Sequence, residues 1–361
     1  MLWWRSPKGA SRQGRRQTIR HGGVEPMLWV VLAALALAGC APAPKKQDTS
    51  DLVWPAPPED PRIRFLAEYS SADDLKKKDF KSSLLGDLGG GPALQKPYGV
   101  AATDDGQRIY VTDTKLRTLM VFDLKKGELH EFKTDARGGL VSPIEVRLDS
   151  ANRVYVTDSV HAKLNVYDPD GTTVLSLGQE QGMKRPTGLA VDEAHDRIYV
   201  SDTTQHRVLV YDLEGNFIRE IGKRGPGPGQ FNYPVNLAVD EQGNLYVVDT
   251  GNFRVQAFDP SGAYKQKFGK LGDKFGSFAR PKGIALDSEG HIYVVDAAFN
   301  NFQIFEKDGT ILLFVGGAGK DPGRFWIPTG IYIDGEDRIY VVDSVNARVQ
   351  VFQYLGGEES G

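Results

Sequence analysis

One short strand is repeated six times in this chain, and each copy ends in aspartate. The copies are RIYVTD (Arg108–Asp113), RVYVTD (Arg153–Asp158), RIYVSD (Arg197–Asp202), NLYVVD (Asn244–Asp249), HIYVVD (His291–Asp296) and RIYVVD (Arg338–Asp343). Their aspartates lie 44 to 47 residues apart. A fixed period of this length indicates one supersecondary unit repeated along the chain, and four short strands per unit are typical of a propeller blade.

Each repeat contains four runs of β-branched or aromatic residues, as the segment Pro234–Gly269 illustrates. The runs are bounded by turns rich in Gly, Asp, Asn, Ser and Pro, and the repeat region has no helical periodicity. The sequence therefore predicts an all-β fold, a six-bladed β-propeller built from four-stranded antiparallel blades.

The two ends of the repeat region complement each other. The last repeat runs from Pro328 to Phe352 and lacks a fourth strand, whereas the run Arg62–Ser70 resembles a fourth strand that has no blade of its own. We expect this N-terminal strand to complete the last blade and close the ring, because closure removes open sheet edges. The predicted propeller spans residues 62–352, and a disordered tail, residues 353–361, follows it.

The first strand of the later repeats has a motif of its own. It reads PTGLAVD (Pro186–Asp192), PKGIALD (Pro281–Asp287) and PTGIYID (Pro328–Asp334). Together with the YVxD strands, these motifs resemble the NHL-repeat family over Pro97 to Phe352. The resemblance implies a six-bladed propeller but no particular activity, because propellers of this kind include RNA-binding proteins, protein scaffolds and a few enzymes.

The N-terminal region predicts export and lipidation. An apolar run from Leu28 to Ala38 is too short to span a bilayer but is typical of a signal peptide. The tetrapeptide Leu37-Ala38-Gly39-Cys40 resembles the lipobox of bacterial lipoproteins, which implies cleavage before Cys40 and attachment of lipid, including palmitate, to it. Residues 1–39 are then the signal peptide, with Met27 as a possible start, and residues 40–61 are a lipidated cysteine and a Pro-rich tether. An ordinary secretory signal or a short anchor helix is the alternative.

The residue after the cysteine bears on localisation. It is Ala41 rather than Asp, so the lipoprotein family's signal for inner-membrane retention is absent. We therefore expect attachment to the outer membrane of the cell envelope, on its periplasmic or surface side. Cys40 is the single cysteine of the chain, which excludes an intramolecular disulfide.

Residues that recur in most blades are predicted to stabilise the fold rather than to bind a ligand. They are the six aspartates of the repeated strand and a basic residue five positions later, present as Lys163, Arg207, Arg254 and Arg348. We expect these basic residues to bind strand ends or neighbouring carbonyl groups.

One face of the propeller is predicted to be basic. It comprises the loops that join a fourth strand to the next first strand and those that join a second strand to a third. In a chain of net charge −3 these loops carry about +13, which favours an anionic partner. The candidate contacts are Lys223, Arg224, Lys270, Lys274, Arg280, Lys320 and Arg324. The aromatic residues among them, Phe231, Tyr233, Phe278, Phe325 and Trp326, either share in binding or pack between blades.

The central channel is the second candidate site. Four first strands carry Gly two residues after their proline, but two blades have Glu145 and Asn236 there. Two residues further on, where most blades have Ala, lie Arg147 and Tyr332. Gluconolactonase-type six-bladed propellers hold a divalent metal with oxygen ligands at such positions, yet calcium needs six to eight oxygens. Because Arg147 shares the side of Glu145, we expect an ion pair there, and we predict no metal and no cofactor.

These observations favour a membrane-anchored propeller that binds or scaffolds an envelope protein or an anionic polymer and is not an enzyme. The alternative is a calcium-dependent hydrolase or lactonase centred on the channel mouth. The histidines lie at unlike blade positions, and the chain has no nucleophile elbow or phosphate-binding loop, so no catalytic residue is assigned. Export argues against a nucleic-acid partner, and we expect a monomer.

Overall fold

The computed structural model describes residues 49, 52–76, 91–135, 139–178 and 180–356. The chain divides into two units, Met1–Asp48 and Thr49–Gly361. The predicted signal peptide and the lipidation site at Cys40 lie outside the described residues.

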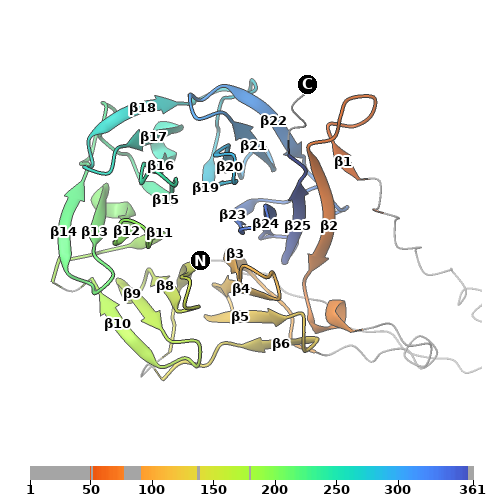
Figure 1. The fold of residues 1–361 in the computed structure, drawn as a ribbon, viewed down its shortest axis with the longest axis horizontal. Helices are drawn as coiled ribbons and strands as arrows, with labels where there is room; N and C mark the ends of the chain where they lie inside the picture. The colour runs from red at the N-terminus through yellow and green to blue at the C-terminus, as the bar shows by residue number, and fades with distance from the viewer. Residues whose placement is uncertain (1–48, 50–51, 77–90, 136–138, 179, 357–361) are drawn as a thin grey trace, which may run out of the picture. The chain divides into compact units, whose positions relative to one another are not determined.

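Six antiparallel sheets stand around a central axis as the blades of a propeller (Figure 1). Blade 1 consists of β3 (Pro97–Ala102), β4 (Arg108–Asp113), β5 (Thr118–Asp123) and β6 (Glu128–Glu131), and blade 2 of β7 (Pro143–Leu148), β8 (Val154–Asp158), β9 (Lys163–Tyr167) and β10 (Thr173–Leu177). Blade 3 consists of β11 (Pro186–Asp192), β12 (Arg197–Asp202), β13 (Arg207–Tyr211) and β14 (Phe217–Ile221), and blade 4 of β15 (Pro234–Val239), β16 (Leu245–Asp249), β17 (Arg254–Phe258) and β18 (Tyr264–Phe268). Blade 5 consists of β19 (Pro281–Leu286), β20 (Ile292–Asp296), β21 (Asn301–Phe305) and β22 (Ile311–Gly316). The predicted fold class is confirmed.

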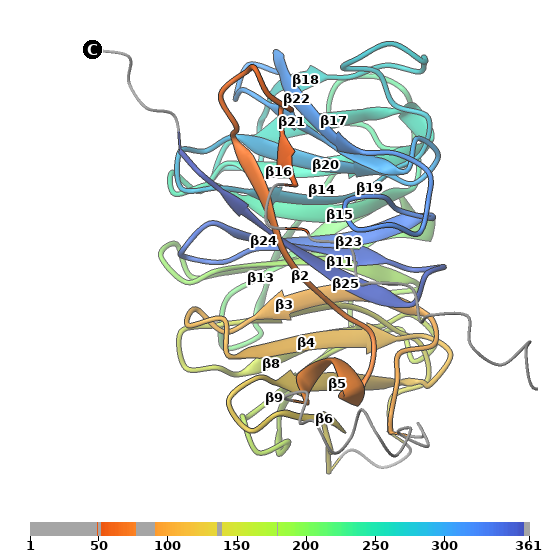
Figure 2. The same cartoon turned by 90° about the vertical axis from the view of Figure 1, so that its right-hand side faces the viewer.

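The last blade confirms ring closure by the N-terminal strand. Its strands β23 (Pro328–Ile333), β24 (Arg338–Asp343) and β25 (Arg348–Tyr354) are followed in the sheet by β2 (Ile63–Tyr69). Strand β2 pairs antiparallel with β25, with Phe65 opposite Phe352 (Figure 2). The two ends of the propeller are therefore joined by main-chain hydrogen bonds.

A short fifth strand extends this sheet beyond the four expected. Strand β1 (Val53–Trp54) pairs with β2 and lies within the segment predicted to be a tether. The side chain of Trp54 packs edge-on against Phe352, with ring centroids 5.7 Å apart. Part of the predicted tether therefore belongs to the sheet of the last blade.

The core lies between the faces of adjacent blades. The middle strands are buried on both faces, and each apolar cluster combines residues of two neighbouring blades. Strands buried on both sides need no polar alternation, which explains runs such as YVVD. Helical structure in the described part is confined to three short 3-10 turns, η1 (Ala72–Leu75), η2 (Thr203–Gln205) and η3 (Thr250–Asn252). None of the helices in this part is long and apolar enough to cross a membrane.

Candidate functional site

The aspartate that ends each repeated strand is a structural residue, as its recurrence predicted. Asp158 is fully buried and accepts backbone N–H bonds from Val141 and Ser142 in the loop before its blade. It also accepts bonds from Val160 and His161 in the loop that follows. One carboxylate thereby fixes the two loops that adjoin on the same face of the blade.

The recurring arginines bind these aspartates and the neighbouring carbonyl groups. Arg254 donates from Nε to Asp249 at 2.9 Å and from its terminal nitrogens to the carbonyl oxygens of Pro226, Gly227 and Gln230. Arg348 repeats this arrangement with Asp343 in blade 6. The structural role expected for the arginines is confirmed, so their charge is not free for a partner.

The four predicted channel residues come together near the axis. Strands β7, β15 and β23 are the innermost strands of their blades and carry Glu145, Asn236 and Tyr332. Arg147 on β7 donates to one oxygen of Glu145 at 2.5 Å, and the amide of Asn236 donates to the other at 2.7 Å. The Arg147 guanidinium also lies 5.7 Å from the centre of the Tyr332 ring.

Burial governs the electrostatics of this channel cluster. The Glu145 side chain is almost inaccessible, and burial raises the pKa of its carboxyl group, while Arg147 and the Asn236 amide act in the opposite direction. The hydroxyl pKa of Tyr332 is likewise raised to about 12 by burial.

The residues of the channel cluster do not fit a calcium ion. Glu145 supplies its only carboxylate, and both of its oxygens already accept hydrogen bonds. The side-chain oxygen of Asn236 accepts a bond from the backbone N–H of Leu237, and the Arg147 cation lies where a metal ion would be repelled. Calcium requires six to eight oxygens. Among the described residues no group of three or more His, Cys, Asp or Glu side chains is arranged to hold a metal ion.

The predicted basic face carries exposed cations, but the sequence sum overstates its charge. The side chains of Lys223, Arg224, Lys270, Lys274, Arg280, Lys320 and Arg324 are all exposed. Within the described part of the chain, they have no ion pair or side-chain hydrogen bond. Beneath them, however, lie the six buried blade aspartates, and Arg207, Arg254 and Arg348 pair with these. The positive charge that remains available to a partner is therefore that of the seven exposed Lys and Arg side chains.

The loop aromatics divide into two groups. Phe231, Phe278 and Phe325 are completely buried and pack on aromatic residues of the blades, so they belong to the core. Tyr233 and Trp326 are about half exposed. The sequence left open whether these aromatic residues bind a partner or pack between blades. The three phenylalanines pack in the core, and Tyr233 and Trp326 are accessible to a partner.

Exposed apolar side chains gather among the cations of the basic face. The large ones that lie in its loops are Val160, Tyr233, Leu271, Phe275, Trp326 and Val345. A hollow of about 450 Å³ between Lys320, Trp326, Val345 and Arg348 lies on the same face. The sequence placed Tyr233 and Trp326 among the aromatic residues of this face, but no sequence signal marked Val160, Leu271, Phe275 and Val345 as exposed.

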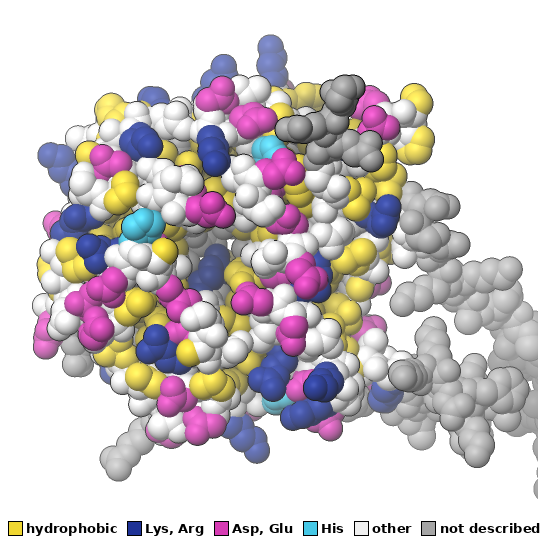
Figure 3. All heavy atoms as spheres, in the orientation of Figure 1, with side chains coloured by type: hydrophobic (Ala, Val, Ile, Leu, Met, Phe, Trp, Pro, Cys, Tyr) yellow, Lys and Arg dark blue, Asp and Glu magenta, His cyan; other side chains and the backbone are white. Residues whose placement is uncertain are grey.

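The opposite face has a different character. It comprises the loops that join first to second and third to fourth strands, and it faces the viewer in Figure 3. Asp and Glu side chains are scattered over it among Lys and Arg, and it is hollowed at its centre. None of the exposed large apolar residues in the described part lies in its loops.

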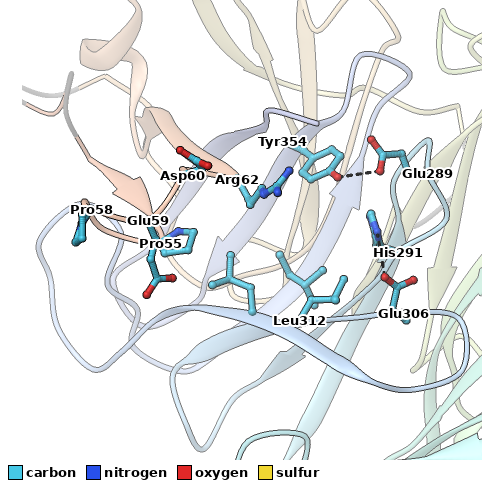
Figure 4. Close-up of a pocket in the computed structure, with 12 residues that line it drawn as sticks. Pro55, Pro58, Glu59, Asp60, Arg62, Glu289, His291, Glu306, Leu312 and Tyr354 are labelled. Carbon is cyan, nitrogen blue, oxygen red and sulfur yellow. Dashed lines mark hydrogen bonds and ion pairs between the residues drawn. The ribbon is translucent and has the colours of Figure 1, made fainter. Parts of the chain in front are cut away.

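A pocket that the sequence did not predict lies at the edge of blades 5 and 6. It has a volume of about 640 Å³ and is bounded by the turn after β1, by strand β22 and by the end of β25. Figure 4 shows Tyr354 directed at Glu289, to which its hydroxyl donates at 3.0 Å, and His291 beside Glu306. The Asp287 carboxylate accepts from His291 Nδ1 and raises the pKa of that histidine. The lining residues come from segments far apart in the chain, so no local motif could reveal the pocket.

The fold and these sites define a six-bladed β-propeller with a buried polar cluster in its channel and two faces that differ in character. A family described as a 6-bladed beta-propeller matches residues 189–269 and 280–358, which correspond to blades 3 to 6. The chain is similar to that family over these residues. No curated protein matches it.

Solved structures with a similar fold come from proteins of different activities. They include virginiamycin B lyase from Staphylococcus aureus, with 16% identity, a TM-score of 0.55 and coverage of 81% of this chain and 99% of the other. A gluconolactonase from Xanthomonas campestris has 18% identity and a TM-score of 0.56, over 80% of this chain and 98% of the other. A protein of unknown function from Bacteroides thetaiotaomicron has 17% identity and a TM-score of 0.59, over 81% of this chain and 75% of the other. At these identities the likeness concerns the fold alone.

Proposed function

We propose that this protein is a lipid-anchored, non-catalytic propeller of the cell envelope that binds an anionic or protein partner through its basic face. The lipobox-like sequence ending at Cys40 supports the anchor, and Ala41 supports attachment to the outer membrane, on its periplasmic or surface side. The motifs PTGLAVD and PTGIYID support the assignment of the blades as NHL repeats.

The single observation that carries the proposal is the composition of the basic face. Seven exposed cations without partners among the described residues are interleaved with six exposed apolar side chains in its loops. Protein surfaces that gather exposed apolar residues mark sites of interaction, and an excess of one sign of charge selects partners of the opposite sign. The rigid ring beneath presents these loops in a fixed arrangement, as a binding module requires.

A metal-dependent hydrolase or lactonase is the alternative, and the fold of the gluconolactonase from Xanthomonas campestris gives it some support. The side chains in the channel of this protein argue against such an enzyme. The single carboxylate of the cluster, Glu145, accepts hydrogen bonds from Arg147 and Asn236, and the adjacent Arg147 cation would repel a metal ion.

Photo-cross-linking in intact envelopes tests the proposal. A photoreactive residue is placed at Phe275 or Val345 on the basic face, and at Glu214 or Glu241 on the opposite face; all four positions are exposed. We expect cross-linked products from the first pair only. The combined change Lys223→Glu, Arg224→Glu, Lys270→Glu and Lys274→Glu should abolish them.

A matched variant controls for net charge. Lys125→Glu, Lys265→Glu, Lys267→Glu and Lys307→Glu reverse the same number of exposed charges away from the basic face. Equal cross-linking from both faces, or equal loss in the two fourfold variants, would refute a partner site on the basic face.

A further inference from the structure

We propose that the partner of the basic face is an anionic lipid bilayer and that the propeller lies with this face flat on the membrane surface. This inference rests on the proposed function and names its partner. Three observations support it: the placement of apolar side chains, their pairing with cations, and the point at which the chain enters the propeller.

The exposed apolar residues come from several loops around the basic face. Phe275 is 69% exposed, Leu271 65% and Val160 63%, which are high values for side chains of this type. They belong to loops of blades 2, 4 and 5, and Trp326 and Val345 add the loops of blade 6. A linear polymer or a small protein would meet only some of these loops, whereas a flat bilayer can meet all of them together.

Cations adjoin the apolar residues in sequence. The loop GKLGDKFG places Lys270 beside Leu271 and Lys274 beside Phe275. Such pairs suit the interface between water and lipid, because the apolar side chain enters the acyl boundary while the charge meets anionic headgroups. Aromatic residues such as Trp326 are favoured at the same depth.

The chain enters the propeller beside this face. Side chains of Leu52 and Trp54 pack onto Gly323, so closely that a Cβ atom there would lie 2.5 Å from the Trp54 ring. Gly323 belongs to the loop between β22 and β23, one of the loops of the basic face. Strand β1 pairs with Ile63 and Arg64 at the start of β2, and because β2 leaves toward the basic face, the antiparallel β1 runs away from that face.

The distance to the predicted lipid site is short. Cys40 precedes Leu52 by twelve residues, which span at most roughly 40 Å when fully extended. Lipid on Cys40 could therefore lie in the bilayer on which the basic face rests. A lipid anchor and a basic patch on the same side of the protein would then act on the same bilayer.

Fluorescent labelling of the full-length chain tests the orientation without the anchor. Cys40→Ala removes the single thiol of the chain, and one cysteine is then introduced at Leu271 or, as the matched control, at Glu241 on the opposite face. Each variant carries a polarity-sensitive dye and is mixed with vesicles of phosphatidylglycerol and phosphatidylethanolamine, or of phosphatidylcholine alone. We expect a blue shift of the dye at position 271 with the anionic vesicles only, and none at position 241.

Co-sedimentation with the same vesicles measures the electrostatic part. The fourfold reversal at Lys223, Arg224, Lys270 and Lys274 should lower partitioning at least about tenfold, since each cation near an anionic surface contributes substantially. The matched reversal at Lys125, Lys265, Lys267 and Lys307 should lower it much less.

The outcomes separate this inference from the proposed function. A dye at position 271 that stays in water, while the basic face still cross-links to a protein in envelopes, overturns the membrane orientation alone. Blue shifts at both labelled positions, or equal partitioning of the two fourfold variants, also overturn it. If neither cross-linking in envelopes nor binding to vesicles is observed, both the proposed partner site and the membrane orientation are refuted.

Discussion

Arg147 donates a 2.5 Å hydrogen bond to Glu145, and both side chains are buried in the channel of the propeller. The other oxygen of Glu145 is bound by Asn236 from a strand two blades away. Glu145, Asn236 and Arg147 stand where most other blades have Gly or Ala, and their polar groups satisfy one another. The pair fills space that the repeat pattern elsewhere leaves to glycine and alanine.

Removing one partner of this pair should cost more than removing both. We predict that Glu145→Ala destabilises the fold by about 3–5 kcal/mol, because it leaves a buried guanidinium without a counter-charge. The double variant Glu145→Ala with Arg147→Ala should recover part of that loss. Urea unfolding of the two single variants and the double variant gives the coupling. Strictly additive losses would mean that the two side chains do not stabilise one another.

The strand that closes the ring should be as critical as a strand in the middle of a blade. Phe65 is buried and packs edge-on to Phe352 with ring centroids 5.5 Å apart, whereas Leu66, its neighbour on the same strand, is exposed. We predict that Phe65→Ala lowers the free energy of unfolding by about 3–5 kcal/mol. Leu66→Ala is the control and should change it by less than about 1 kcal/mol. Equal effects in thermal unfolding would contradict closure by β2.

The repeat allowed most of the fold to be predicted, because strand length, turn residues and the missing fourth strand are all local signals. Strand β1 was not predicted, since two residues within a Pro-rich segment carry no strand pattern. The association of Glu145 with Arg147 could be inferred because they lie on one strand, two residues apart. The exposure of loop side chains could not be inferred from the sequence, because it depends on how the loops pack in three dimensions. Phe231 is buried and Trp326 is exposed, although both belong to the same kind of loop.

The blade arginines should not tolerate replacement of the guanidinium group by another cationic group. Arg254 binds Asp249 and three carbonyl oxygens, an arrangement that requires the planar fork of the guanidinium. We predict that Arg254→Lys destabilises the protein by about 2–4 kcal/mol although it keeps the charge. Lys267→Arg, a change of the same pair of residue types at an exposed site, should be neutral. Chemical denaturation of both variants checks this, and a neutral Arg254→Lys would show that charge alone matters.

The edge pocket should give the stability of the protein a dependence on pH. Asp287 raises the pKa of His291, so protonated His291 stabilises the fold fully below its unfolded pKa of about 6.5, and this stabilisation is lost as pH rises through the folded pKa. Glu289 and Glu306 from the same blade act in the same direction. We predict that the contribution of His291 to the unfolding free energy falls between mildly acidic and mildly alkaline pH.

Two variants taken from other blades isolate this effect. Arg338 in blade 6 and Asn244 in blade 4 hold the position of His291 and bind the corresponding aspartates. His291→Arg and His291→Asn should therefore keep the contact with Asp287 but flatten the pH profile in that range. A profile unchanged in both variants would assign the pH dependence to another group.

Calcium should leave the stability of the protein unchanged, because the channel cluster has a single carboxylate and a cation beside it, whereas calcium needs six to eight oxygens. Glu145 has one oxygen bound to Arg147 and the other to Asn236, and a calcium ion would have to displace both. We predict that the midpoint of thermal unfolding is the same in excess calcium and after treatment with a chelator. The Glu145→Gln variant should behave in the same way toward calcium. A calcium-dependent rise of the midpoint that is lost in Glu145→Gln would place the ion in the channel and favour the hydrolase over the binding module.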